Sequence, residues 1–469
     1  MVSASPKPHP PSGHAVSTRE RSLIPVGMAT ILPQAARQVR NLEGRLLTQI
    51  ARWGYDEIIL PTFEYLDVLA PGLEAELLET CYQFIDRTTG RTLLLRPDAT
   101  AQVARTIGMG LTGAAVPQRL CYRTSVFRYE PEHAGRGREI FQVGAELVGV
   151  EGVAGDSEIV SLLIECLQDI GLASFTIALG HVGFIKGLIA RSGLSPLGQK
   201  RAEQAAAKKD LPRLEEVLAR ERIAKSMAKA IREAPELTGG EEVLDRGRVL
   251  AGGDPVLLES LDRLSQLFHG LSAAGYRQSL LLDLGEFRGF DYYDGIVFDV
   301  FAEGVGSELG GGGRYDHLIG RFGRPLPSTG FALDVDRLFH AVKFPEGEAQ
   351  GARVDCLVVG PRRAMRLIGQ VAGDLRRGRG RVVQQVLSGS DDAVKAEALS
   401  LGQAQQASTV MVVGLSGKDR DEVLVAESVA ASAHPGSPKA AKRPSFKRVA
   451  LADLLKGTRG RKRAGKGRS

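Results

Sequence analysis

The amino-acid sequence predicts an α+β core with a helical insertion, followed by a small α/β domain. Three observations predict this organisation. Short apolar segments typical of strands recur along the first part of the chain, a stretch between about residues 185 and 275 has helical spacing instead, and strands alternate with a helix after residue 352. The chain has 469 residues, of which 43% are hydrophobic, so two or more folded domains with sizeable cores are expected.

The core is expected to span residues 21–343, after a flexible Pro- and Ser-rich segment at residues 1–20. A helix is predicted from Pro33 to Trp53, because proline suits a first helical turn and apolar residues recur on one face. These apolar residues are Val39, Leu42, Leu46 and Ile50. The strand candidates that follow are residues 57–60, 92–95, 119–129, 139–149 and 278–301.

The helical insertion, at about residues 185–275, is rich in Ala, Leu, Glu, Lys and Arg, and Asp254-Pro255 is a start signal for one of its helices. Beyond it, residues 352–433 predict the α/β domain, because CLVVG, RVVQQVL and STVMVVG are typical strands around one helical stripe. Such alternation predicts a partly parallel sheet, with residues 445–457 as a candidate for its last element.

The net charge of +6 is concentrated at one end of the chain. Residues 436–469 hold 12 Lys and Arg but a single acidic residue, Asp453, so the rest of the chain is mildly acidic. The last segment, residues 458–469, is of low complexity and predicts a disordered basic tail. A merely solvated tail is favoured over attraction to nucleic acid, which stays open.

The sequence gives little evidence for a secreted, membrane-spanning or metal-binding protein. No apolar run resembles a signal peptide or a membrane span, so a cytoplasmic protein is expected. The four cysteines are scattered without a CxxC pair, and neither GxGxxG nor GxxxxGK[ST] occurs. We therefore expect no metal and no cofactor.

The strand REIFQVGAELVG, residues 138–149, is the most informative segment. Alternation places Phe141, Val143, Ala145 and Leu147 on one face and Gln142, Gly144 and Glu146 on the other. The second face could simply lie on solvent. We favour the floor of a ligand site, because glycine often marks a close approach and its neighbours are an amide and a carboxylate.

Arginines and tyrosines near this strand suit an anionic ligand, since the guanidinium fork donates two parallel hydrogen bonds. They are Arg128, Arg136, Arg138, Arg288, Tyr292, Tyr293, Arg314 and Tyr315. A further arginine, Arg337, falls in the first turn of a helix predicted after GFALD, where the helix dipole disfavours a cation unless an anion is near. That anion is either a ligand phosphate or the carboxylate of Asp334.

These stretches resemble a known family. FRYE through FQVGAE, RGFDYY, GGRYD and GFALDVDRL occur in the order of the class II aminoacyl-tRNA synthetase core, in its histidyl form, over roughly residues 22–343. The resemblance implies an antiparallel sheet flanked by helices. The second unit is similar to a divergent version of that family's anticodon-binding domain.

The resemblance also implies two subsites. The amino-acid subsite maps onto Asp98, Thr100, Gln142, Glu146, Tyr293 and Tyr315. The first three would hold the ammonium group and backbone, and the others would surround an imidazole, whose nitrogens need polar partners. The phosphate subsite of an active synthetase maps onto Arg128, Arg288 and Arg337.

The departures from the synthetases fall on the nucleotide side. Asp334 stands where the family has a glycine against the nucleotide. A carboxylate about 5 Å from a phosphate charge opposes it by roughly 3 kcal/mol at an effective dielectric near 20. Asp334 can also pair with Arg337 at i, i+3, or it can simply cap the helix. The usual ERP reads Glu130-Pro131-Glu132 here, and Thr30 replaces an aspartate, whereas LRPDAT only shortens an acid.

The branch with matching stretches is the regulatory subunit of ATP phosphoribosyltransferase, a paralogue of histidyl-tRNA synthetase. RPDxTxQxAR, LGHVGF, GGGGRYDxLxGRFG and GFxLDxDRL are similar to segments that begin at Arg96, Leu179, Gly310 and Gly330. Within LGHVGF, His181 is expected to be structural rather than a catalytic base, because it lies where a strand meets a helix.

This resemblance implies a regulatory subunit without catalytic residues. Its partners would be the short catalytic subunit of a glycosyltransferase complex and L-histidine as feedback inhibitor, with a homodimeric core inside a hetero-octamer. Two alternatives stay open: an active histidyl-tRNA synthetase, supported by the retained arginines, and an RNA-binding module that uses the second domain and the basic tail.

Overall fold

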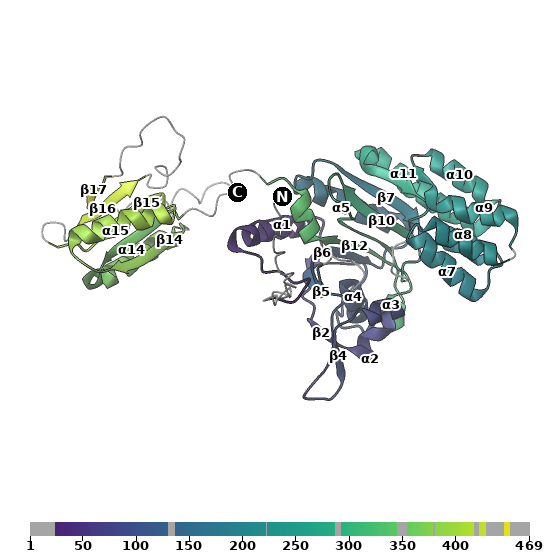
Figure 1. Cartoon of the computed structure of the whole chain (residues 1–469), viewed down its shortest axis with the longest axis horizontal. Coiled ribbons are helices and arrows are strands. Elements are labelled where there is room, and N and C mark those ends of the chain that lie inside the picture. Colours follow the sequence, from purple (N-terminus) through teal and green to yellow (C-terminus); the bar gives the residue numbers. More distant parts are fainter. Residues whose placement is uncertain are drawn as a thin grey trace, which may run out of the picture. The chain divides into compact units, whose positions relative to one another are not determined.

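The computed structural model describes residues 24–129, 137–221, 223–286, 292–344, 354–378, 380–416, 422–427 and 445–450. The chain folds as two compact units, Met1–Lys343 and Phe344–Ser469 (Figure 1). The predicted segments 1–20 and 458–469 lie outside the described residues.

The first unit is built on a large, mostly antiparallel sheet, which in the described ranges has nine strands. In spatial order they are β1 (Asp56–Glu57), β5 (Gln118–Phe127), β6 (Glu139–Val148), β12 (Ser328–Asp334), β11 (Gly310–Arg314), β10 (Ile296–Ala302), β7 (Phe175–His181), β9 (Leu280–Asp283) and β8 (Thr238–Gly239). Only the pairs β1–β5 and β7–β9 of these are parallel. The antiparallel core predicted from the class II resemblance is thereby confirmed.

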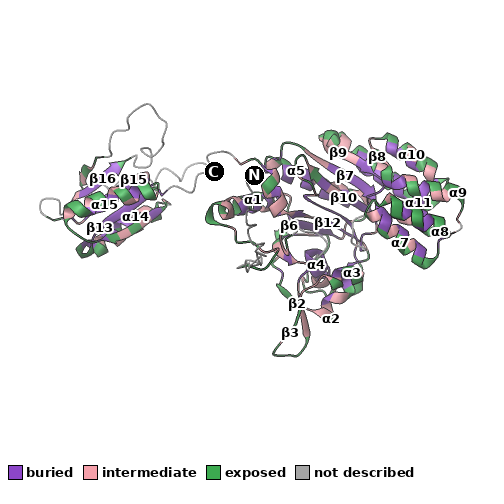
Figure 2. Cartoon of the chain, viewed as in Figure 1, coloured by how far each residue is buried: buried purple, intermediate pink, exposed green. Residues whose placement is uncertain are grey.

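Helices cover one face of this sheet because each carries an apolar stripe, which is coloured as buried in Figure 2. They are α1 (Pro33–Arg52), α5 (Gly152–Asp169), α11 (Pro255–Leu271) and α12 (Val335–Ala341). The predicted stripe of α1 is fully confirmed, since Val39, Leu42, Leu46 and Ile50 are all buried. The other face carries α2 (Leu66–Leu69), α3 (Ala75–Glu79), α4 (Ala99–Gly108) and a small sheet of β2 (Phe63–Tyr65), β4 (Thr92–Leu95) and β3 (Gln83–Ile85).

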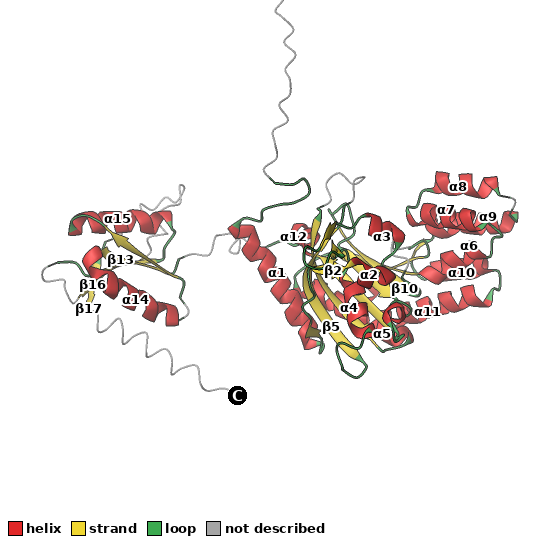
Figure 3. Cartoon of the chain, turned by 90° about the horizontal axis from the view of Figure 1, so that it is seen from below, coloured by secondary structure: helices red, strands yellow, loops and turns green. Residues whose placement is uncertain are grey.

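The helical insertion stands on the β10 side of the sheet, away from β5, as Figure 3 shows. It contains α6 (Val182–Ala190), α7 (Pro196–Ala207), α8 (Leu211–Arg220), α9 (Lys225–Glu233) and α10 (Glu242–Ala251) before α11. The predicted start of α11 is confirmed, because the Asp254 side chain accepts hydrogen bonds from the backbone N–H groups of Val256 and Leu257.

The second unit is a sheet between two helices. Its elements are β13 (Cys356–Pro361), α14 (Met365–Arg377), β14 (Val382–Leu387), α15 (Asp391–Ala404), β15 (Thr409–Val413), β16 (Glu422–Glu427) and β17 (Lys447–Ala450). Strand β13 runs parallel to β14 and β15, while β16 and β17 are antiparallel. The predicted partly parallel sheet is therefore correct.

Two strand predictions were too long. In place of the expected strand 57–60, the structure has the two-residue strand Asp56–Glu57. The apolar residue Ile59 is 90% exposed, so it does not mark a buried strand position. The expected strand 278–301 is two strands, β9 and β10, which do not pair with each other, because β7 lies between them.

Candidate functional site

A cavity of about 1240 Å³ lies beside the sheet and reaches from the start of α4, on one face, to α1 and α12, which cover the other. Its walls come from β6, β11 and β12, from the starts of α4 and α12, and from the segment before α1. Eight of the predicted site residues line it: Asp98, Thr100, Arg128, Gln142, Glu146, Tyr293, Tyr315 and Arg337. Arg288, like Arg136 and the Glu130–Glu132 exchange, lies outside the described residues.

Glu146 forms the centre of the amino-acid half of the cavity. Its side chain is buried, and its Oε1 accepts hydrogen bonds from the Thr100 hydroxyl at 2.8 Å and the Tyr122 hydroxyl at 3.3 Å. Its Oε2 accepts from the Tyr315 hydroxyl at 2.5 Å. Burial raises the pKa of Glu146 to about 8, and the nearby Asp98 carboxylate adds to the rise, while the hydroxyl donors oppose it.

Strand register explains how Glu146 fits. It lies opposite Gly330 on β12, and a Cβ at that position would lie 1.7 Å from the Glu146 Oε2 atom. A glycine at residue 330 is therefore needed to leave room for the Glu146 carboxylate above the sheet.

Tyr122 is the residue that sequence reasoning missed. It lies opposite Gly144 in the β5–β6 pair, and a Cβ at residue 144 would lie 2.5 Å from the Tyr122 hydroxyl oxygen and 2.6 Å from the Phe331 carbonyl oxygen. The close approach expected at Gly144 is thus made by a tyrosine ring and a neighbouring strand. The available signal for Tyr122 was a tyrosine opposite a glycine, Gly144, on the neighbouring strand.

Phe141 corrects the predicted alternation of this strand. Val143, Ala145 and Leu147 are fully buried as expected. Phe141 also lines the cavity, because the cavity extends to Val39 of α1 and to Phe339 of α12.

Asp98 begins α4 and faces the same half of the cavity. Its carboxylate accepts hydrogen bonds from the backbone N–H groups of Thr100 at 3.2 Å and Ala101 at 3.4 Å. Burial raises the pKa of Asp98, and the charge of Arg128 opposes the rise. Arg128 also donates through its Nε to the Pro97 carbonyl oxygen at 2.8 Å, which ties it to the same loop.

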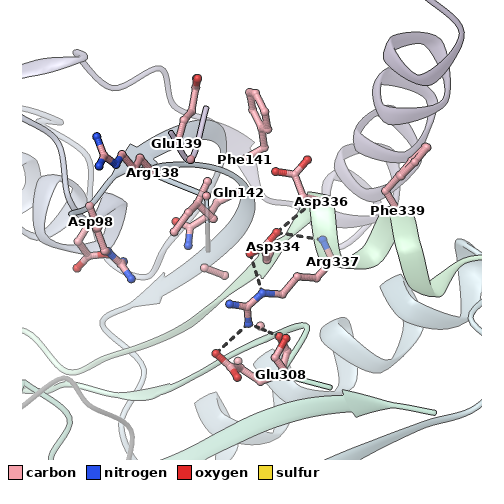
Figure 4. A pocket seen from close by; sticks show the side chains of 18 of the residues that line it. Asp98, Arg138, Glu139, Phe141, Gln142, Glu308, Asp334, Asp336, Arg337 and Phe339 are labelled. Atoms are coloured by element: carbon pink, nitrogen blue, oxygen red, sulfur yellow. Dashed lines mark hydrogen bonds and ion pairs between the residues drawn. The ribbon is translucent and has the colours of Figure 1, made fainter. Parts of the chain in front are cut away.

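Arg337 is held by two carboxylates of the chain itself (Figure 4). Its Nε lies 3.1 Å from Asp334 Oδ2, and its Nη1 lies 2.9 Å from Glu308 Oε1 and donates to the Glu308 carbonyl oxygen. Asp334 also caps α12, since its Oδ1 accepts from the backbone N–H groups of Asp336 at 3.0 Å and Arg337 at 3.1 Å. The two roles predicted as alternatives for Asp334 therefore coexist.

Four carboxylates line the cavity in the part that holds Arg337, and Arg138 lies next to one of them, Glu139. Asp336 and Glu139 line it beside Asp334 and Glu308. Burial raises the pKa of Asp336 to about 6, and the charge of Asp334 is the next cause. A polyanion that entered this part of the cavity would meet these carboxylates next to an arginine that is already paired.

Two residues singled out in the sequence lie outside the cavity lining. Arg314 is 2% exposed and forms an ion pair at 2.9 Å with Asp156, with a second pair to Asp316 at 3.0 Å, so it is structural. His181 caps α6, because its Nδ1 accepts from the backbone N–H of Gly183 at 3.1 Å, and burial lowers the pKa of His181 to about 4. Its predicted structural role is confirmed.

The described ranges lack both a metal-binding cluster and a membrane-spanning helix. No group of three or more His, Cys, Asp or Glu residues there could hold a metal ion. In the same part of the chain, no helix combines the length and apolarity that crossing a membrane requires.

Comparisons with known proteins agree with this architecture. A family model described as histidyl-tRNA synthetase matches residues 27–338. The ATP phosphoribosyltransferase regulatory subunit of Moorella thermoacetica is 41% identical over 68% of this chain and 81% of its own length. That of Desulforamulus reducens is 36% identical over 86% of this chain and 99% of its own.

Solved structures give the same picture. A Bacillus halodurans protein described as an ATP phosphoribosyltransferase regulatory subunit/histidyl-tRNA synthetase superposes with a TM-score of 0.72 at 27% identity, over 84% of this chain and 98% of that one. The histidyl-tRNA synthetase of Nostoc sp. PCC 7120 shares the fold, with a TM-score of 0.68 at 18% identity over 93% and 99% of the two chains.

The sheet, its motifs and the cavity over β6 and β12 define a protein of the class II aminoacyl-tRNA synthetase fold. Within that class the chain belongs to the histidyl-tRNA synthetase family, in its branch of ATP phosphoribosyltransferase regulatory subunits.

Proposed function

We propose that this chain is the non-catalytic regulatory subunit of ATP phosphoribosyltransferase, which acts in the first step of histidine biosynthesis, and that its cavity binds L-histidine instead of carrying out aminoacylation. The observation that carries this proposal is the pairing of Arg337 with Asp334 and Glu308. An arginine whose guanidinium is already bound by two carboxylates is a poor phosphate ligand. Among the described residues of the amino-acid half, Glu146 is held by hydroxyl groups and not by a charged partner.

The amino-acid half suits histidine chemically. Asp98 would pair with the α-ammonium group and Gln142 with the backbone of the ligand, while Glu146, Tyr293 and Tyr315 would meet the imidazole ring. Thr100 and Tyr122 would act as positioning residues, because both donate to Glu146. A site built to hydrogen-bond both ring nitrogens discriminates strongly against side chains without them.

The partner we propose is the short catalytic subunit, which would require this chain for activity. The assembly would be a cytoplasmic hetero-octamer around a homodimeric core of this chain. Histidine would inhibit the complex by binding its inactive arrangement more tightly than its active one, because a ligand with equal affinity for both shifts nothing.

The test is reconstitution with the purified catalytic subunit. We expect a complex of defined mass by light scattering, phosphoribosyltransferase activity only in the mixture, and inhibition by histidine. Glu146→Gln and Tyr315→Phe should abolish the inhibition while assembly persists, whereas Tyr276→Phe, which removes a hydroxyl that bonds Glu165 elsewhere in the fold, is the matched control. Inhibition that is unchanged in both cavity variants would place the effector site elsewhere.

The competing enzyme function is tested separately. Histidine-dependent exchange between ATP and pyrophosphate by the purified chain would identify an active synthetase and would overturn the regulatory proposal.

A further inference from the structure

The carboxylate of Glu146 is buried without a cationic hydrogen-bond donor among the described residues. Its three donors are hydroxyl groups, on Thr100, Tyr122 and Tyr315. The charged or titratable groups around it come from several elements. They are Tyr55 before β1, Tyr122 of β5, Asp98 at the start of α4, Tyr292 and Tyr293 before β10, and Tyr315 after β11. The cation Arg128, just after β5, lines the same cavity and acts on Asp98.

A buried carboxylate with only neutral donors is costly to ionise, and a second acid nearby increases that cost. With its pKa raised to about 8, Glu146 holds a proton at neutral pH in the empty cavity. A free histidine ring, with a pKa of about 6.5, is mostly neutral at the same pH. When such a ring meets a protonated carboxyl, the pair contains one proton, which supplies the missing positive charge for the carboxylate.

We propose that this chain binds histidine through a single proton shared between the imidazole ring and Glu146, so that binding is strongest near neutral pH and weakens on both sides. This inference rests on the proposed histidine site and adds the protonation state of the complex. Feedback inhibition would then be most sensitive at the pH of the cytoplasm and would decline in acid and in alkali.

The direction of proton exchange depends on how many protons the free protein and the free ring hold at a given pH. Below pH 6.5 the free protein and the free ring each hold a proton, so forming the pair releases one. Above pH 8 neither holds one, so forming the pair takes one up. For pKa values of about 6.5 and 8, the affinity peaks near about pH 7.2 and is about fourfold weaker at about pH 5.8 and about pH 8.7, where about 0.8 proton is released or taken up.

The experiment is calorimetric titration of the full-length chain with L-histidine at these three pH values, each in two buffers of different ionisation enthalpy. We expect proton release at the acid value and uptake at the alkaline value. Glu146→Gln should bind histidine too weakly for inhibition in the reconstituted complex, so it is titrated at higher concentrations. Release in acid should persist there, because it comes from the ring, and uptake in alkali should fall to what the α-amino group of histidine contributes.

Two further variants keep the test informative if Glu146→Gln does not bind. Tyr122→Phe removes one donor that stabilises the ionised carboxylate, so the alkaline decline should move to higher pH. Asp336→Asn removes a second cavity acid, whose pKa is raised to about 6, and both proton signals should remain.

Affinity that stays constant between about pH 7 and about pH 8.7, without proton uptake, would overturn this inference and leave the proposed function standing. Absence of saturable histidine binding at every pH would overturn the proposed function as well.

Discussion

Replacing Asp334 by glycine should raise the affinity of the cavity for ATP. At 3.1 Å from Arg337 Nε, the Asp334 carboxylate attracts that arginine with roughly 5 kcal/mol at an effective dielectric near 20, before desolvation is subtracted. It would also oppose a phosphate about 5 Å away by roughly 3 kcal/mol. Removing it leaves Glu308 as the remaining carboxylate on Arg337, so we expect ATP to bind about one to two orders of magnitude more tightly.

The assay is calorimetric titration with ATP, and the cost to folding is small. A glycine at a helix N-cap loses only about a few tenths of a kcal/mol relative to aspartate, so α12 should still form. Asp334→Asn is the matched control, because it keeps an oxygen for the two backbone N–H groups of α12 but removes the charge. It should give a smaller gain, since its side chain still occupies the space.

Two results would refute this reasoning. The first is an unaltered chain that already binds ATP as tightly as Asp334→Gly. The second is a loss of ATP binding when Arg337→Ala is introduced into the unaltered chain, because an arginine held by two carboxylates should contribute little there. In the Asp334→Gly background, by contrast, Arg337→Ala should remove the gain.

Three further predictions concern stability. Asp156→Asn leaves the buried Arg314 with only the partly exposed Asp316 as an ionic partner and should lower the free energy of unfolding by about 3 kcal/mol, measured by urea denaturation with the fluorescence of Trp53, the single tryptophan. Gly144→Ala should cost about 1–3 kcal/mol in the same assay, because the new methyl group would overlap the Tyr122 ring. Asp336 has a pKa raised by folding to about 6, so its charge destabilises the fold progressively from about pH 4 to above pH 6. Asp336→Asn should therefore match the unaltered chain near about pH 4 and exceed it at about pH 7.5 by on the order of 1 kcal/mol, a value reduced because the side chain is partly exposed; equal stabilities at both pH values would contradict this.

Much of the fold follows from local patterns in the sequence. The signals for α1 and α11 each lie within one helix, so they can be read from the sequence alone. They are the three- and four-residue spacing of apolar residues in α1, the proline in its first turn, and the Asp254 cap of α11. The spatial order of the strands is different. β6 and β12 are neighbours although about 180 residues separate them, and no local pattern specifies that pairing. The resemblance implied an antiparallel sheet but not the order of its strands.

The candidate site divides in the same way. Glu146 was found because alternation along one strand places it with Gln142 on a polar face. Glu308 was not found, because it lies in the connection between β10 and β11 and reaches Arg337 only after β11 and β12 pair. Tyr122 was missed for a related reason, since its partner Gly144 lies across a strand pair.

The carboxylate partners of Arg337 decide whether this arginine could bind a phosphate. Counting arginines would assign the nucleotide half to an active enzyme, because Arg128 and Arg337 both line the cavity. The partners of Arg337 argue against this assignment. Asp334 is the N-cap of α12 and Glu308 lies in the loop between β10 and β11, and together these two carboxylates neutralise the charge of the arginine. Removing the arginine would have a cost, because taking one member out of a partly buried ion pair leaves the other charges unpaired. The retained Arg337 is therefore explained by its present partners, and its presence gives no support to ATP binding.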